Sequence, residues 1–349
     1  MARRKRVWVS QDSGAGYHIV SRVVGGQLLF GDQEKEYFLK LLEVFAQGFF
    51  VDIHGFTIMG NHVHILATGR EADAKFAAAE ELIRRYRLVY GKDAEYPIGK
   101  TESDGTVWPD EDGGIERLRN RLGSISRFVQ ELKQTFSKWY NMKNKRTGFL
   151  WSDRFKGIIV DKGVALLMCS AYIDLNAYRA GLVKQPEDYR WSSLGMRMRS
   201  KKRAKKFLTP IKIEAHKELE RLALKIRKGK TDDLAWYREF VYISGEIEKE
   251  GKAAIPAEVV KEIKDLNAKL GLGESLKFRI RNFSEGVTIG SEAFIEEIAV
   301  PCPCPQHLSS HLDLSLPLSH LGTYDSKIGP ETTIPITSLY ISFQHSSLT

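Results

Sequence analysis

The sequence is poor in cysteine and has no long apolar run. Three cysteines among 349 residues cannot build a disulfide framework. The PCPCP segment, which holds Cys302 and Cys304, lacks the two-residue gap of a zinc knuckle. No apolar stretch approaches the roughly 20 residues that cross a bilayer. The basic N-terminus, MARRKRVWVS, is not followed by an apolar signal core. We therefore expect a cytoplasmic protein with no membrane partner.

Basic residues outnumber acidic ones, 53 to 44. The formal net charge is +9, and 28% of the residues are charged against 42% hydrophobic, a balance typical of globular chains. A basic balance favours a polyanionic partner, although ordinary soluble proteins also carry such a charge.

Hydrophobic periodicity predicts alternating strands and helices in the first half of the chain. Strands are expected at 17–24, twice within 50–68 and after 148; helices are expected at 32–49 with Asp32 as N-cap, at 71–90, from Ser124, and from 162 to about Asn176. Residues 91–114 are expected to form a loop. The order β-α-β-β-α-β-α, with an insertion, predicts an α+β fold in which a ferredoxin-like antiparallel sheet carries helices on one face.

Composition divides the chain into three parts. Residues 1–195 are expected to form the first domain, with an insertion at about 71–123. Residues 196–300 open on a basic run, RMRSKKRAKK, and are expected to form a small, mostly helical domain. Residues 301–349 hold six of the eleven prolines, nine serines and no arginine, and we expect a poorly ordered or foreign tail.

Two histidines alternate within a strand-like run, FTIMGNHVHILATG. Side chains i and i+2 of a strand point to one face, so His62 and His64 are expected to leave the sheet together. A pair of neutral imidazoles suits a divalent cation. Two polar residues on a solvated sheet face are the alternative, as is a zinc site completed by Cys169. His18 and His54 are expected to be structural or to face nucleic acid.

A tyrosine and an asparagine one turn apart supply the remaining chemistry. Tyr172 and Asn176 are i and i+4 in LLMCSAYIDLN and should share a helix face. An amide oxygen is a hard ligand suited to Mg²⁺ or Mn²⁺, and a tyrosine can attack phosphorus to give a covalent phosphotyrosine. Tyr140 is a rival nucleophile, although it falls in an aromatic packing stripe, and Tyr178 is expected beyond the helix end.

Basic and aromatic residues suggest a path for single-stranded nucleic acid through phosphate pairing and base stacking. Three basic runs occur, RRYRLVY, RLRNR and RMRSKKRAKK, although such a run is usually a solvated face. Near the predicted site the expected DNA-binding residues are Arg22, Trp151, Arg154, Lys156 and Arg179.

Several segments resemble the REP-associated tyrosine transposases of the HUH single-tyrosine superfamily. The similar segments are YHIVSRVVGGQLLF, TIMGNHVHILATG, RTGFLWSDRFKG and YIDLNAYRAGLV…PEDYRWSS, in order within 5–195, with FSEGVTIGSEAFIEE similar to the end of longer members. A common family form is NPVRAGLV where this chain has NAYRAGLV. The resemblance implies that His62 and His64 bind the divalent metal, that Asn176 faces it, and that Tyr172 is the nucleophile.

The expected function is that of a Mg²⁺- or Mn²⁺-dependent transposase. It would nick repeat-flanked single-stranded or hairpin DNA through a 5′-phosphotyrosine on Tyr172 and later rejoin the strand, and we expect it to be associated with the nucleoid. A homodimer with Tyr172 acting in trans is compatible with the family. The alternatives are a decayed transposase that only binds DNA or RNA hairpins, and a metal-dependent phosphodiesterase that uses water as nucleophile.

Overall fold

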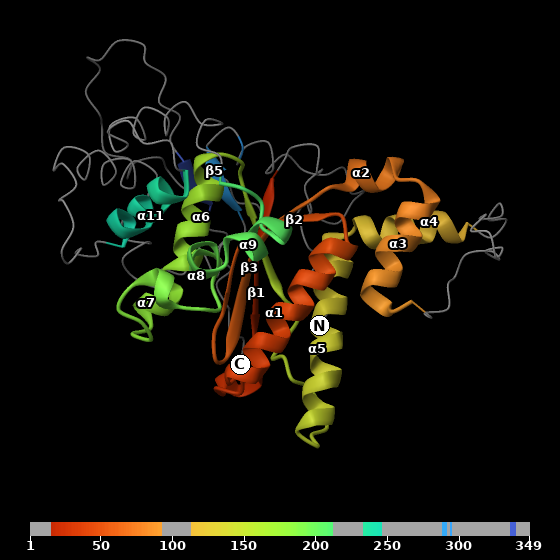
Figure 1. Cartoon of the computed structure of the whole chain (residues 1–349), viewed down its shortest axis with the longest axis horizontal. Helices are drawn as coiled ribbons and strands as arrows, with labels where there is room; N and C mark the ends of the chain where they lie inside the picture. Colours follow the sequence, from red (N-terminus) through yellow and green to blue (C-terminus); the bar gives the residue numbers. More distant parts are fainter. Residues whose placement is uncertain are drawn as a thin grey trace, which may run out of the picture.

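The computed structural model describes a sheet with helices packed around it (Figure 1). The described residues are 15–92, 113–211, 233–245, 288–291, 294 and 336–339. Several sequence predictions fall outside the described residues. These are the loop at 93–112, helices in 212–232, the second domain over 246–287, the PCPCP segment and most of the tail.

The described strands form one sheet in the order β2-β3-β1-β4-β5-β6. All neighbouring pairs are antiparallel except β4 with β5, which is parallel. The first four strands have the ferredoxin-like order and direction, so the predicted α+β fold is confirmed. The strands are β1 (Gly16–Arg22), β2 (Val51–Ile58), β3 (His62–Gly69), β4 (Lys156–Val160), β5 (Thr288–Ser291) and β6 (Ile336–Leu339). β6 lies within the predicted tail.

Most helices fall where the sequence predicts them, but the helix predicted over 71–90 is two helices separated at residues 77–78. They are α1 (Asp32–Gly48), α2 (Glu71–Phe76), α3 (Ala79–Tyr90), α4 (Gly114–Gly123), α5 (Ile125–Lys143), α6 (Val164–Asp174), α7 (Asn176–Arg179), α8 (Ser193–Arg199), α9 (Lys201–Phe207) and α11 (Asp233–Ser244). The predicted N-cap of α1 is off by one residue. Gly31 is the N-cap, because the carboxylate of Glu34 accepts a hydrogen bond from its backbone N–H at 3.0 Å.

Helices cover both faces of the sheet, which corrects the predicted one-sided arrangement. Tyr17, Ile19 and Ile65 pack in the core under α1 and α5, whereas Leu66 and Ile158 pack in a second core with α6. In Figure 1 the sheet stands between α6 on one side and α1 with α5 on the other. The physical reason is visible in β1, whose first six residues are all buried, so both faces need a covering layer.

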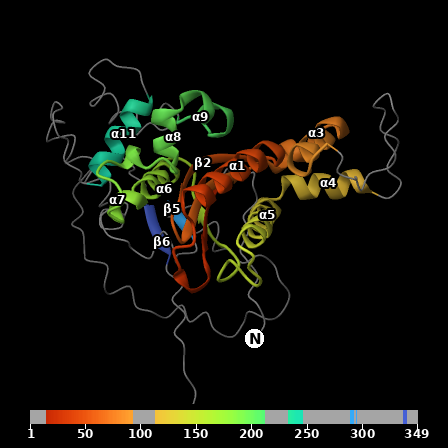
Figure 2. The same cartoon turned by 60° about the horizontal axis from the view of Figure 1, so that its bottom comes forward.

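The segment 71–123 supplies α2, α3 and α4, which lie beyond α1 and α5 in Figure 1. Figure 2 shows α3 and α4 in the same place. α3 packs closely on the end of α1. A Cβ at Gly48 would stand 2.1 Å from a methyl of Val89, so this contact requires glycine.

The chain after β4 packs back onto the sheet. α8 contacts β2, and α9 contacts α1. The predicted domain boundary at residue 195 falls inside α8. The buried carboxylate of Asp174 in α6 accepts hydrogen bonds from Ser193 Oγ at 2.6 Å, Leu194 N at 2.9 Å and Tyr237 Oη at 2.7 Å. One side chain thus joins α6, α8 and α11. No helix among the described residues is both long and apolar enough to cross a membrane.

His54 in β2 makes stability depend on pH. Its ring is 2.7 Å from Thr68 Oγ1, and burial, followed by the charge of Arg197, lowers its pKa to about 4. The unfolded chain therefore takes up a proton near pH 6.5 that the folded chain refuses, so stability falls as the pH drops below 6.5. We expect this side chain to cost about 2 kcal/mol between about pH 7 and pH 5. Urea unfolding of the wild type and His54→Gln at both pH values measures it, and identical pH slopes would contradict it.

Candidate active site at one end of the sheet

The two histidines of the HVH motif lie on the α6 face of the sheet. Across the β1–β3 ladder, His62 stands opposite Arg22 and His64 opposite Val20. On the other side of β1, Val20 also pairs with Lys156, so that side chain leaves the same face. The imidazoles of His62 and His64 and the cationic side chains of Arg22 and Lys156 therefore lie on the α6 face. They are located where β1 ends and β3 begins.

His64 lies between the sheet and α7. It is 3% exposed. Its Nδ1 is 2.8 Å from Nε2 of His18 on β1, and its Nε2 is 3.2 Å from Nδ2 of Asn176. The His18 and His64 rings stack with centroids 5.0 Å apart. Polar groups thus surround both nitrogens of His64 and fix its ring orientation.

His62 is oriented by the residue before it. Its Nδ1 is 2.6 Å from Oδ1 of Asn61, whose amide also donates to the carbonyl of Gly26 at 2.9 Å. An Nδ1–H donated to Asn61 puts the ring's lone pair on Nε2, the arrangement found at histidines that ligate metals. The His62 and His64 rings are 5.0 Å apart and nearly perpendicular.

The electrostatics of the site favour a neutral imidazole. Burial lowers the pKa of His64 well below its ordinary value, and the nearby His18, His62, Arg22 and Arg179 lower it further. The lowered pKa of His64 favours its neutral form, in which one ring nitrogen keeps a lone pair that can be donated to a cation.

Tyr172 approaches the histidines from α6. Its ring centroid is 6.1 Å from that of His64 and 5.9 Å from that of His18. α6 ends at Asp174 and Asn176 begins α7, slightly earlier than the predicted end, yet both Tyr172 and Asn176 face His64. Tyr172 is 4% exposed, and the guanidinium of Arg179 lies 4.8 Å from the centroid of the Tyr172 ring. The sequence-predicted phenol, imidazole and amide are thus close together in one chain.

The predicted DNA-binding residues divide into two groups. Arg22, Lys156 and Arg179 border the histidine pair, and Arg154 is exposed in the turn before β4. Trp151 lies elsewhere, with its indole packed against Phe30, Phe38 and Phe136 and its Nε1 donating to a backbone carbonyl at 3.3 Å. Core packing therefore explains Trp151 without a role in base stacking.

The rival residues are accounted for by packing. Tyr140 is buried with Phe30 and Phe136 in the core under α1 and α5, on the sheet face opposite the histidine pair. Cys169 is fully buried within the α6 core, and burial raises the pKa of its thiol. In the described part of the chain, no group of three or more His, Cys, Asp or Glu side chains could hold a metal. The zinc alternative is therefore excluded for His62, His64 and Cys169.

Two polar residues at or near the site, Asn61 and Asp174, are not singled out by the sequence pattern. His18, expected to be structural or to face nucleic acid, contacts His64, which is 46 positions away. Asn61 could have been noticed because it directly precedes the HVH motif. Asp174 lies between Tyr172 and Asn176 but faces away from the histidines, toward α8 and α11.

The side chains suited to a divalent cation are His62, His64 and Asn176. Two neutral imidazoles and one amide form an incomplete ligand set, which a phosphate oxygen or water would complete. The contacts of Asn61 with His62 and of His18 with His64 are of the kind that orient metal ligands. These residues therefore fit a weakly held Mg²⁺ or Mn²⁺ better than a closed structural site.

Comparisons with known proteins give one structural likeness. No family model matches the chain, and no curated protein matches it. The structure of a REP-associated tyrosine transposase bound to a REP hairpin is similar, with a TM-score of 0.36 and 14% sequence identity, over 60% of this chain and 89% of that one.

Proposed function

We propose that this protein is a metal-dependent endonuclease and strand transferase that acts on single-stranded or hairpin DNA. The observation that carries the proposal is the convergence of the Tyr172 ring, 6.1 Å from His64, with Asn176, 3.2 Å from the same imidazole. A phenol beside two imidazoles and an amide is suited to phosphoryl transfer, and the cations around it are suited to a nucleic-acid backbone.

His62, His64 and Asn176 would hold the metal, and when bound it would polarise the scissile phosphate and orient it. Asn61 and His18 act as positioning residues, because each fixes the ring of one histidine. Arg22, Lys156, Arg154 and Arg179 would pair with phosphates on either side of the cleaved bond.

In the proposed step the phenolic oxygen of Tyr172 attacks phosphorus. The new bond joins that oxygen to the 5′-phosphate, and the bond from phosphorus to the 3′-oxygen breaks. The phenol loses its proton to solvent, and the departing 3′-oxygen takes one up, so no other reactant is needed. Attack by a second 3′-OH on the phosphotyrosine reverses the step and joins two strands.

Hairpin binding without cleavage is the second candidate. Tyr172 is only 4% exposed, and Arg179 lies over its ring, so a scissile phosphate reaches the phenol only if α7 shifts. A chain that has lost this motion would still bind DNA through the cations around the histidines.

We expect the wild type to form a covalent protein–DNA adduct with labelled hairpin oligonucleotides and Mn²⁺, and Tyr172→Phe to form none. A denaturing gel detects the adduct. Tyr178→Phe is the matched control, since Tyr178 belongs to the adjacent helix α7 and should keep the adduct. Cleavage without an adduct, retained in Tyr172→Phe but lost in His62→Ala, would indicate water as the nucleophile. Binding without any cleavage would favour the second candidate.

A further inference from the structure

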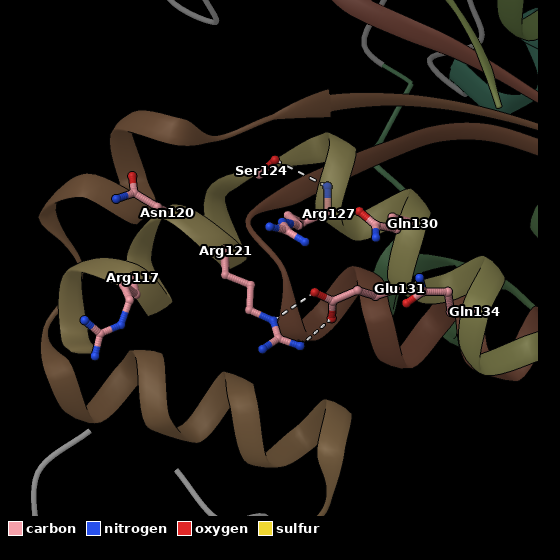
Figure 3. A pocket seen from close by; sticks show the side chains of 8 residues that line it. All are labelled: Arg117, Asn120, Arg121, Ser124, Arg127, Gln130, Glu131 and Gln134. Atoms are coloured by element: carbon pink, nitrogen blue, oxygen red, sulfur yellow. Dashed lines mark hydrogen bonds and ion pairs between the residues drawn. The ribbon is translucent and has the colours of Figure 1, made fainter. Parts of the chain in front are cut away.

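A polar hollow of about 540 Å³ lies where α4 meets α5, within the inserted segment and the helix that follows it. The side chains around it form two helical stripes at i, i+3, i+4 and i+7 spacing. From α4 and its junction come Arg117, Asn120, Arg121 and Ser124, and from α5 come Arg127, Gln130, Glu131 and Gln134. In Figure 3 Arg121 reaches from α4 toward Glu131 of α5, and dashed lines mark their contacts.

The chemistry of this hollow is that of hydrogen-bond donors. Glu131 is the lining carboxylate, and it is already held by Arg121 through two contacts of 2.8 and 3.0 Å. Arg121 also lies 4.9 Å from the ring centroid of Tyr90, so its guanidinium is fixed. Arg117 and Arg127 are exposed, and the guanidinium of Arg127 makes no ion pair within the described ranges. Three guanidiniums and three amides therefore face one concave surface.

The hollow lies far from the histidine pair. In Figures 1 and 2, α4 is at one end of the molecule and α6 with α7 at the other, with the sheet and α1 between them. A ligand bound here cannot be the phosphate that faces Tyr172.

We propose that this hollow binds the phosphodiester backbone of a DNA segment flanking the one at Tyr172. The inference rests on the proposed function, because it assumes that the protein handles DNA. Guanidiniums and primary amides are the side chains that contact phosphate and sugar most often. The concave shape suits a rounded backbone better than a solvated helix face does. The basic run RLRNR, residues 117–121, thereby gains a function that the histidine site does not give it.

The test compares salt dependence of binding. Fluorescence anisotropy gives the Kd for a hairpin with and without a flanking extension, without divalent metal, over a range of NaCl concentrations. For the extended DNA, Arg117→Gln/Arg127→Gln should lower the slope of log Kd against log salt by about 0.7 to 0.9 per arginine. The bare hairpin should show no change. Because the readout needs no cleavage, failure of the nicking proposal leaves this result interpretable.

Arg84→Gln/Arg87→Gln is the matched control, since it removes two exposed arginines of α3 that do not line the hollow. It should leave the slope for the extended DNA unchanged. An equal loss in the control would show that overall charge is responsible and would overturn the proposal. So would an unchanged slope in the hollow variant, an equal loss for the bare hairpin, or displacement of DNA by inorganic sulfate beyond its ionic-strength effect, which indicates a small-anion site.

Discussion

Replacing His64 by alanine is expected to reduce Mn²⁺-dependent cleavage of hairpin DNA by more than about 100-fold, beyond the usual cost of losing a residue that only orients a metal ligand. The expectation follows from its place at the centre of the site. Its ring contacts His18 and Asn176 and lies beside Tyr172, and its pKa is low enough to keep it neutral. Removing the ring removes a proposed metal ligand and the group that contacts the amide of Asn176.

Comparing histidine variants distinguishes loss of His64, the proposed metal ligand, from loss of His18, which contacts and orients it. His18→Asn should lose about 10- to 100-fold, because it affects the orientation of His64 and not the ligation itself, and added Mn²⁺ should restore part of the loss. His54→Gln is the control, since His54 is a partly buried histidine of the same sheet that bonds to Thr68 instead. Cleavage rates at increasing Mn²⁺, with a chelator as blank, give the comparison. Equal losses in all three variants would indicate general destabilisation and no metal site.

Replacing Asp174 by alanine is expected to lower the free energy of unfolding by about 3 to 4 kcal/mol. The carboxylate is 1% exposed and accepts from a serine hydroxyl, a backbone N–H and the phenol of Tyr237. Burial raises its pKa, and the hydrogen bonds oppose that rise. Without the carboxylate, three buried donors lose their acceptor at once, and α6 loses its tie to α8 and α11.

Tyr237→Phe is the matched comparison for Asp174. It removes one of the three bonds, leaves the carboxylate in place, and should cost about 1 kcal/mol. Urea denaturation followed by circular dichroism measures both variants. An Asp174→Ala cost no larger than that of Tyr237→Phe would mean that the three bonds do not act together as described.

The sequence predicts the parts of the fold that depend on local spacing. The period-2 pattern places His62 and His64 on one face, and the i, i+4 spacing relates Tyr172 to Asn176. Features set by distant partners are missed. The second helical layer goes unnoticed because His18 and Ser21 are polar and so look solvent-exposed in the sequence. Both are buried, one on each face of β1.

The same limit applies at the level of single side chains. Trp151 reads as an exposed stacking platform because nothing near it in sequence shows that Phe30, Phe38 and Phe136 surround it. The partner of His18 is missed for the same reason, since its contact with His64 depends on strand pairing. Asn61 is different, because its contact with His62 is local, and a polar residue directly before the motif is a usable signal.

The most direct measurement is to identify the residue that carries DNA in the trapped adduct. After nuclease and protease digestion, mass spectrometry should find the residual nucleotide phosphate on the peptide that contains Tyr172, in the wild type and in Tyr178→Phe alike. A phosphate on any other tyrosine, or an adduct of undiminished yield in Tyr172→Phe, would contradict the assignment of this phenol and the site built around it.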